Sequence, residues 1–413
     1  MPDQNRETRG EQHPGQPAGQ HPNWFERNPK KTIIFIVGFV VILLDLILAP
    51  FYAERIPNIK NAHYHHDLDA NFRGVMTWGP RHYMVHTNSL GFKDRTNRAV
   101  QLKTDKYRIV FIGDSFTEGI GYPYEETFVG LIDRELAKSN YEVLNSGVSS
   151  FSPKLYYLKI KYLIENVGLK FDELDVYLDI SDIQDEIEYE DFQPSGSYGF
   201  AMANRLIFMV KKYSLIGNVA ARKLILLRRE WLIRSIGAKL PQPAEQVQNK
   251  ATPAGQDQEV AANPNLWGNV DAYLDERADW VYREEVFKKW GEKGVSLAAQ
   301  NMDKLADLCK KYQIKLIIAV YPWPKEVLTK NFNSKNILIW EDFCKKREIP
   351  FLNCYPDFFN NRQDENIKDK YYLGGDVHFN QYGQKIMAKA WLDRFKAPSQ
   401  GASDGSGLPV WQH

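Results

Sequence analysis

Four short polar segments carry the residues whose types and spacing could do chemistry. In chain order they are Gly113-Asp114-Ser115, Asn145-Ser146-Gly147, Ser181-Asp182 and Asp376-Val377-His378. Catalysis by a Ser–His–Asp triad needs a hydroxyl, an imidazole that takes its proton and a carboxylate that orients the imidazole. The four segments contain all three groups, in the chain order Ser, Asp, His.

The elements around these segments bring them to one edge of a predicted sheet. Strand-like apolar runs cover 107–112, 141–145, 174–180, 314–321 and 349–355. Amphipathic segments alternate with them over 123–138, 153–166, 296–311, 334–347 and 381–396. This alternation is typical of a parallel sheet with helices on both faces. Ligands of such sheets bind beyond the carboxyl ends of the strands, which is where the polar segments fall.

On these residues the chain resembles the SGNH (GDSL-type) hydrolase superfamily, over about 107–186 and 296–396. Gly113-Asp114-Ser115 is similar to the family's first block, Gly147 to the second and Asp376-Val377-His378 to the last. The stretch HTNSLGFKD at 86–94 is similar to the lead-in of bacterial envelope members. The resemblance implies a three-layer α/β/α fold of the flavodoxin-like type with a five-stranded parallel sheet. It also implies an ester hydrolase or an O-acyltransferase.

The resemblance implies a role for each block. Ser115 would attack the acyl carbonyl, His378 would be the general base and Asp376 would fix the imidazole tautomer. The N–H groups of Ser115 and Gly147 would hold the oxyanion, with Ser181 in the place of the family's usual Asn. Loss of one oxyanion donor can lower the rate by about 10²–10³. Three readings therefore stay open: a site rebuilt around Ser181, a slow enzyme, or a role without catalysis.

A single membrane span is predicted ahead of this domain. Residues 32–52 are apolar apart from Asp45 and are long enough, as a helix, to cross a hydrocarbon core of about 30 Å. Arg27, Lys30 and Lys31 lie just before the span, so the positive-inside rule places the N-terminus in the cytoplasm. We expect an uncleaved single-pass anchor in the cytoplasmic (inner) membrane and a periplasmic catalytic domain. Asp45 is either a functional group or a tolerated charge near the outer end.

The expected organisation is a series of segments along the chain. They are a disordered tail (1–31), the anchor (32–52), an N-terminal extension (53–106), the first part of the SGNH-like domain (107–185), a helical insertion (186–295) with disordered 241–265, the second part of the domain (296–396) and a disordered tail (397–413). Within the insertion, 205–239 holds nine basic residues against one acid. A basic amphipathic helix of this kind binds an anionic membrane or polyanion, or else caps the domain with a solvated face.

The composition excludes other classes of function. The chain has 53 Lys and Arg against 52 Asp and Glu, and this balance argues against a nucleic-acid-binding protein. Three cysteines are too few for a disulfide framework or a zinc knuckle, although Cys344 and Cys354 either pair or stay buried thiols. We expect no cofactor and no metal in the catalytic site.

Other candidate sites have weaker support. Residues 401–405 fit the G-x-S-x-G pattern but follow no strand, as the nucleophile elbow requires. His63, His65 and His66 either ligate a metal or belong to a polar linker. The acidic residues between Glu186 and Asp191 are interpreted as a solvated face.

One function and one alternative follow from these observations. We expect a membrane-anchored serine esterase that removes or transfers acyl groups through an acyl-Ser115 intermediate. The resemblance implies that the substrate is an acylated cell-surface glycan and that the acyl group is acetyl above all. The alternative is a catalytically weak or inactive polysaccharide-binding module of an export or envelope-assembly complex. The expected partners are an acylated glycan and the membrane, the latter through 32–52 and 205–239. No protein partner can be named, and either water or a sugar hydroxyl could accept the acyl group.

Overall fold

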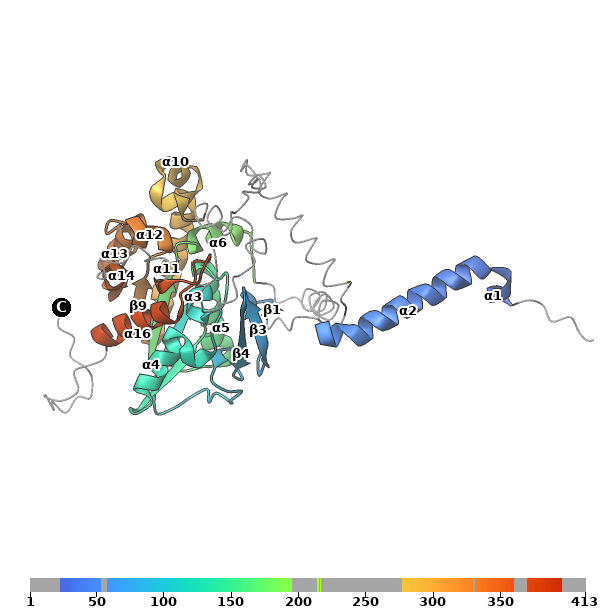
Figure 1. The fold of residues 1–413 in the computed structure, drawn as a ribbon. Coiled ribbons are helices and arrows are strands. Elements are labelled where there is room, and N and C mark those ends of the chain that lie inside the picture. Colours follow the sequence, from blue (N-terminus) through green and yellow to red (C-terminus); the bar gives the residue numbers. More distant parts are fainter. Residues whose placement is uncertain are drawn as a thin grey trace, which may run out of the picture. The chain divides into compact units, whose positions relative to one another are not determined.

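The computed structural model describes residues 23–52, 58–194, 214, 216, 277–329, 331–359 and 370–395. The chain forms two compact units, residues 1–53 with 209–225 and residues 54–208 with 226–413. The first unit contains α1 (Trp24–Arg27) and α2 (Pro29–Tyr52) (Figure 1). Within α2, Pro29–Leu48 has a mean hydropathy of 2.6, so the helix is long and apolar enough to cross a membrane. The N–H of Ile216 donates to Asp45 Oδ1 at 3.0 Å.

An eight-stranded sheet organises the second unit, in the order β10-β9-β8-β6-β7-β5-β4-β3. Five of its strands are parallel: β6 (Tyr107–Gly113), β7 (Tyr141–Asn145), β8 (Glu173–Leu178), β9 (Lys315–Val320) and β10 (Phe351–Asn353). They are the five strands that the sequence predicts, with ends displaced by at most two residues. The predicted parallel sheet is therefore confirmed.

The N-terminal extension, expected over 53–106, adds strands to this sheet that the sequence analysis does not predict. Its strands β5 (Lys93–Asp94), β4 (Arg81–Thr87) and β3 (Arg73–Trp78) continue the sheet beyond β7 in antiparallel order. Two further strands, β1 (Asn58–Asn61) and β2 (His65–Leu68), form a separate antiparallel pair. The extension is therefore part of the folded domain and not a linker to the anchor.

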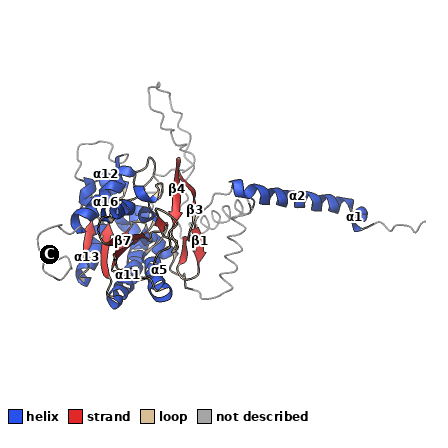
Figure 2. Ribbon diagram, turned by 90° about the horizontal axis from the view of Figure 1, so that it is seen from below, coloured by secondary structure: helices blue, strands red, loops and turns tan. Residues whose placement is uncertain are grey.

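Helices cover both faces of the sheet (Figure 2). The connections from β6 to β7 through α4 (Phe128–Leu136) and from β7 to β8 through α5 (Pro153–Tyr162) run in opposite directions across the sheet. Right-handed crossovers therefore put α4 and α5 on opposite faces. The helix α16 (Gln381–Phe395) packs beside α4, and α11 (Glu292–Tyr312) packs beside α5. The other helices are α3 (Ser115–Glu118), α6 (Asp182–Glu188), α10 (Glu284–Val286), α12 (Pro324–Thr329), α13 (Lys335–Arg347) and α14 (Tyr355–Phe359).

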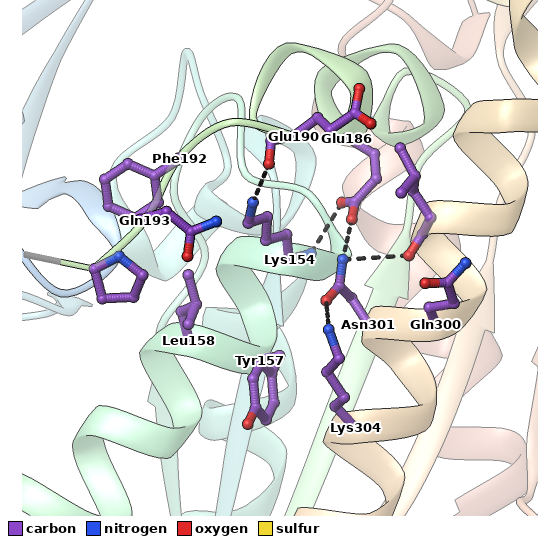
Figure 3. Close-up of a pocket in the computed structure, with 12 residues that line it drawn as sticks. Lys154, Tyr157, Leu158, Glu186, Glu190, Phe192, Gln193, Gln300, Asn301 and Lys304 are labelled. Atoms are coloured by element: carbon purple, nitrogen blue, oxygen red, sulfur yellow. Dashed lines mark hydrogen bonds between the residues drawn. The ribbon is translucent and has the colours of Figure 1, made fainter.

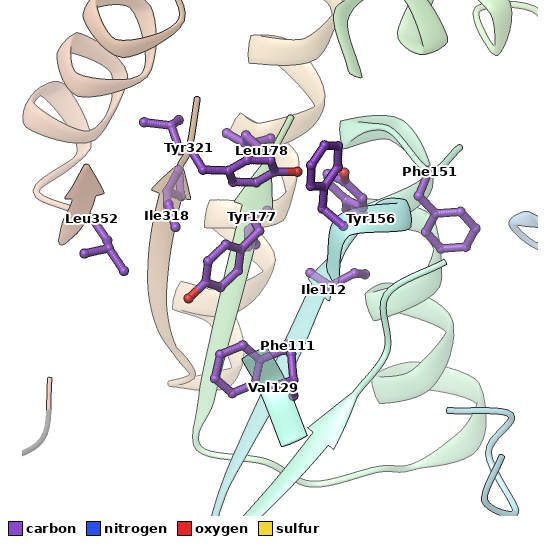
Figure 4. Close-up of a cluster of buried hydrophobic side chains, with 14 of the residues drawn as sticks. Phe111, Ile112, Val129, Phe151, Tyr156, Tyr177, Leu178, Ile318, Tyr321 and Leu352 are labelled. Carbon is purple, nitrogen blue, oxygen red and sulfur yellow. The ribbon is translucent and has the colours of Figure 1, made fainter. Parts of the chain in front are cut away.

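The central strands are buried on both faces and form the core. Phe111, Ile112, Tyr177 and Ile318 are each at most 1% exposed and lie together in Figure 4. Burial stabilises a fold by about 25 cal/mol for each Å² of apolar surface removed from water. The large buried side chains therefore hold the strand ends, and the polar segments that follow them, in fixed positions.

Several predictions can be compared with this architecture. Cys309, Cys344 and Cys354 are buried free thiols, so the pairing of Cys344 with Cys354 does not occur. Between 186 and 295, residues 277–294 carry the buried Ala278, Trp280 and Val281 of the core. The expected basic helix at 205–239 falls outside the described residues except for Ser214 and Ile216, and the expected disordered stretches 241–265 and 397–413 fall wholly outside them. The tail expected to be disordered over 1–31 lies outside them only as far as residue 22. From Trp24 on it is helical, in α1 and in the first turn of α2, so the prediction is wrong there.

Candidate active site

The nucleophile stands at the turn from β6 into α3. Asp114 caps this helix, since its Oδ1 accepts from the N–H of Phe116 at 2.9 Å. Gly113 is required at the end of the strand, because a Cβ there would lie 2.1 Å from Thr117 Oγ1. Strand, cap and helix together fix the backbone of Ser115 at the carboxyl edge of the sheet.

The structure brings Ser115, His378 and Asp376 together as a hydrogen-bonded triad. Ser115 Oγ lies 2.8 Å from His378 Nε2, and His378 Nδ1 lies 2.9 Å from Asp376 Oδ1. His378 is 8% exposed and lies just before α16, in a segment closed by a β-bridge between Tyr372 and Phe379. With Nδ1–H donating to Asp376, Nε2 is free to accept the Ser115 proton. The predicted grouping of these three residues is therefore present in the geometry.

The electrostatics of the triad stabilise the charged Asp376–His378 pair that forms when His378 takes a proton. Burial alone raises the pKa of Asp376, but the charge and hydrogen bond of His378 and a hydrogen bond from Trp78 outweigh it and hold that pKa at about 2. Burial alone lowers the pKa of His378, but the charge and hydrogen bond of Asp376 outweigh it and the pKa is raised above 6.5. The site therefore stabilises the imidazolium that forms when His378 takes a proton.

Trp78 is a site residue that sequence reasoning missed. Its indole Nε1 donates to Asp376 Oδ2 at 2.5 Å, and its ring stands edge-on to the His378 ring at 5.1 Å between centroids. It comes from the end of β3, 298 residues before Asp376. No local motif marks it, because its neighbours in the sequence carry no recognisable pattern.

The three predicted oxyanion donors differ in their surroundings. The N–H of Ser115, at the start of α3, has no acceptor within the described residues. The N–H of Gly147 donates to Asn145 Oδ1 at 3.0 Å, in a turn where a Cβ on Gly147 would lie 2.6 Å from the Glu118 nitrogen. The Ser181 hydroxyl donates to Asp179 Oδ2 at 2.5 Å. Since a hydroxyl has one hydrogen, Ser181 must leave Asp179 before it can donate to an oxyanion.

Three buried carboxyl groups lie behind the nucleophile. One oxygen from each of Asp114, Asp179 and Asp182 lies within 4.8 Å of the others, a spacing that could hold a metal ion. Four of the six oxygens accept hydrogen bonds from groups other than Ser115. Asp114 Oδ2 lies 3.3 Å from Ser115 Oγ, whose one hydrogen goes to His378 in the triad, and Asp182 Oδ1 has no partner among the described residues. Burial, followed by the charge of Asp179, raises the pKa of Asp114 to about 8. The raised pKa favours the neutral form of Asp114, and that form reduces the repulsion among the three carboxyl groups.

The extension also supports the loop that carries Gly147. Lys159 Nζ donates to the Ser146 carbonyl at 3.1 Å and pairs with Asp67 Oδ1 at 2.8 Å. His66 Nε2 lies 2.8 Å from the Ser149 carbonyl, and burial lowers the pKa of His66 to about 4. The predicted His63, His65 and His66 cluster is thus a packed part of the domain, with His63 stacked on Tyr162.

The acidic run from Glu186 to Asp191 is only partly the solvated face that the sequence suggests. Glu188, Glu190 and Asp191 are exposed as expected, but Glu186 is 1% exposed and accepts from the Lys154 N–H at 2.9 Å, so the prediction is wrong there. The sequence places Glu186 in an acidic run, whereas α6 turns it inward toward α5 and α11. It lines a pocket of about 280 Å³ with Lys154, Asn301 and Lys304 (Figure 3). Residues 401–405 lie outside the described residues.

Comparisons with known proteins find similarity among solved structures. No protein-family model matches the chain, and no curated protein matches it. A member of the lipolytic protein G-D-S-L family from Veillonella parvula is 14% identical, with 70% of this chain and 98% of that chain covered and a TM-score of 0.34. An acetylxylan esterase from Geobacillus stearothermophilus is 12% identical, with 71% and 95% covered and a TM-score of 0.36. A GDSL-like lipase from Bacteroides thetaiotaomicron is 14% identical, with 71% and 90% covered and a TM-score of 0.32.

The architecture and the site are visible in the chain itself. Its parallel sheet lies between two layers of helices, with Ser115 directly after β6 and His378 directly before α16. These features agree with the resemblance to the SGNH hydrolases.

Proposed function

We propose that this protein is a serine esterase of the SGNH type. The observation that carries the proposal is the unbroken hydrogen-bonded series from Ser115 through His378 to Asp376, with distances of 2.8 and 2.9 Å. Such geometry activates a hydroxyl that is otherwise a weak nucleophile. Ester hydrolysis and O-acyl transfer both begin with the same attack.

The mechanism follows from these contacts. Ser115 Oγ attacks the acyl carbonyl while His378 Nε2 takes the hydroxyl proton, and Asp376 stabilises the resulting imidazolium. The carbonyl oxygen becomes negative and is held by the N–H group of Ser115. The N–H of Gly147 and the hydroxyl of Ser181 are the second and third donors once they turn from Asn145 Oδ1 and Asp179 Oδ2, their acceptors in this structure. The C–O bond to the leaving group then breaks, and His378 returns the proton to the leaving oxygen. Water or a sugar hydroxyl attacks the acyl-Ser115 in the same way and regenerates Ser115.

The substrate proposed is an acyl ester, in particular an acetyl ester, on a cell-surface glycan. This part rests on the resemblance of residues 86–94 and of the D-x-H spacing of Asp376 and His378 to envelope members of the family. The proposed place is the outer side of the cytoplasmic membrane. It is supported by α2 and by Arg27, Lys30 and Lys31 at its start. Protease added to spheroplasts should then degrade the catalytic domain, whereas a cytoplasmic domain would survive until lysis.

One experiment tests the activity. Full-length protein in detergent is incubated with p-nitrophenyl acetate, with and without a glycan acceptor, and acetyl is followed by mass. A fluorophosphonate probe should label the wild type, and Ser115→Ala should abolish both labelling and turnover with folding unchanged. Ser139→Ala, which changes an exposed serine after α4, is the matched control and should behave as wild type. Equal labelling of wild type and Ser115→Ala would remove Ser115 from its role.

A second function is favoured by one observation. Ser181, in the place of the family Asn, donates its hydroxyl hydrogen to Asp179 and not toward the nucleophile. A domain in this state would bind an acylated glycan without turning it over. A wild-type protein that neither reacts with the probe nor hydrolyses the ester, yet binds the glycan, would establish this alternative.

A further inference from the structure

The hairpin formed by β3 and β4 ends directly beside the triad. Trp78 and Arg81 are the last paired residues of the hairpin, and Gly79 and Pro80 form the turn between them. Arg81 Nε donates to the Gly121 carbonyl at 3.0 Å, and its guanidinium lies 4.2 Å from the centre of the Tyr122 ring. The end of the hairpin is thus attached to the segment that follows the nucleophile helix.

Trp78 donates to the carboxylate oxygen of Asp376 that does not bind the His378 imidazole. Asp376 Oδ1 accepts from His378 Nδ1 and from the Val377 N–H, at 2.9 and 2.7 Å. Asp376 Oδ2 accepts from Trp78 Nε1 at 2.5 Å. Because a carboxylate turns about its Cβ–Cγ bond, a donor on Oδ2 holds Oδ1 toward the imidazole. The Trp78 ring also lies edge-on to the His378 ring, and this contact restricts the movement of the imidazole.

We propose that Trp78 is a positioning residue that acts through Asp376, so that the N-terminal extension completes the active site. This inference rests on the proposed esterase function. The extension is joined to the rest of the site at a second place, through Asp67 and Lys159. The contact at Trp78 differs because it reaches a member of the triad directly.

The first test is Trp78→Phe in the full-length protein. Phe keeps an aromatic ring beside His378 but has no N–H for Asp376. Loss of a hydrogen bond to a charged group should lower the kcat of Trp78→Phe for p-nitrophenyl acetate by about tenfold to a hundredfold, with KM little changed. Trp340→Phe is the matched control, because the Trp340 indole is buried in α13 and its N–H has no acceptor among the described residues. That control should leave kcat unchanged for the folded protein.

The second test separates positioning from a structural role. Trp78→Phe is combined with Asp376→Ala, and probe-labelling rates are compared for the four proteins. If Trp78 acts through Asp376, the tryptophan substitution should have little further effect once the carboxylate is gone. An effect as large in the Asp376→Ala background as in the wild type would overturn the proposal.

A spectroscopic test does not depend on turnover. The indole proton of Trp78, assigned by its disappearance in Trp78→Phe, should resonate downfield and move upfield in Asp376→Ala. An unmoved resonance would show that the bond to Asp376 does not form and would refute the inference. If the wild type had no esterase activity but the resonance moved, the proposed function would fail while the contact that positions Asp376 would stand.

Discussion

The buried ion pair between Lys159 and Asp67 ties the extension to the oxyanion loop, and its removal should be costly. The Lys159 side chain is 0% exposed and that of Asp67 is 3% exposed, with Nζ and Oδ1 2.8 Å apart. Burial raises the pKa of Asp67 and lowers the pKa of Lys159, in each case against the attraction of the partner. The attraction between the two charges therefore offsets only part of the free-energy cost of removing them from water. Either charge left alone in the core would be uncompensated.

The magnitude follows from what each substitution leaves behind. Lys159→Met leaves Asp67 with the Tyr64 hydroxyl and the Leu68 N–H as donors but without a buried cation. Loss of one partner of a buried pair costs about 3–5 kcal/mol, or about 6–20 °C in Tm for a domain of this size. The double variant Lys159→Met with Asp67→Asn removes both charges. It should be more stable than the sum of the two single effects by about 1–3 kcal/mol.

Thermal unfolding followed by tryptophan fluorescence, with the full-length protein in detergent, checks this expectation. Lys161→Met is the matched control, since Lys161 is exposed on the same helix and its loss should change stability by less than about 0.5 kcal/mol. The single variants should also lose esterase activity, because Lys159 holds the Ser146 carbonyl next to Gly147. A Lys159→Met protein as stable as Lys161→Met would refute the reasoning, as would strictly additive single effects.

Three further predictions concern the catalytic groups. Ser181→Ala should lower kcat by about tenfold or more, with KM little changed. Ser181→Asn should retain or raise activity. An Ala variant as fast as wild type would show that the Ser181 hydroxyl stays with Asp179. The pH profile of kcat/KM should fall on the acid side at a pH above 6.5, because His378 must be neutral to accept a proton and its pKa is raised. Asp376→Asn removes the charge that raises this pKa, so the acid limb should move to lower pH while the rate drops by about 10⁴. An acid limb that did not move in Asp376→Asn would argue against the assignment of His378 as the titrating base.

Much of the fold and the triad could be predicted because their signals are local. An apolar run, a polar loop and an amphipathic helix repeat along the chain, and each repeat describes one strand, one turn and one covering helix. Parallel strands put all their carboxyl ends at one edge, so Ser115 and His378 were expected to meet although 263 residues separate them. The triad then follows from residue type and topology.

The surroundings of these residues were decided by tertiary structure alone. Whether Ser181 donates to an oxyanion or to Asp179 depends on a side-chain hydrogen bond formed when the loop after β8 folds back on itself. Trp78 and Lys159 acquire their roles only when the extension adds strands to the sheet and packs against it. Glu186 is buried because α6 turns it toward Lys154 and Asn301. Hydrophobic periodicity reports which face of an element is covered, but hydrogen-bond partners far apart in sequence are chosen by the packed three-dimensional arrangement.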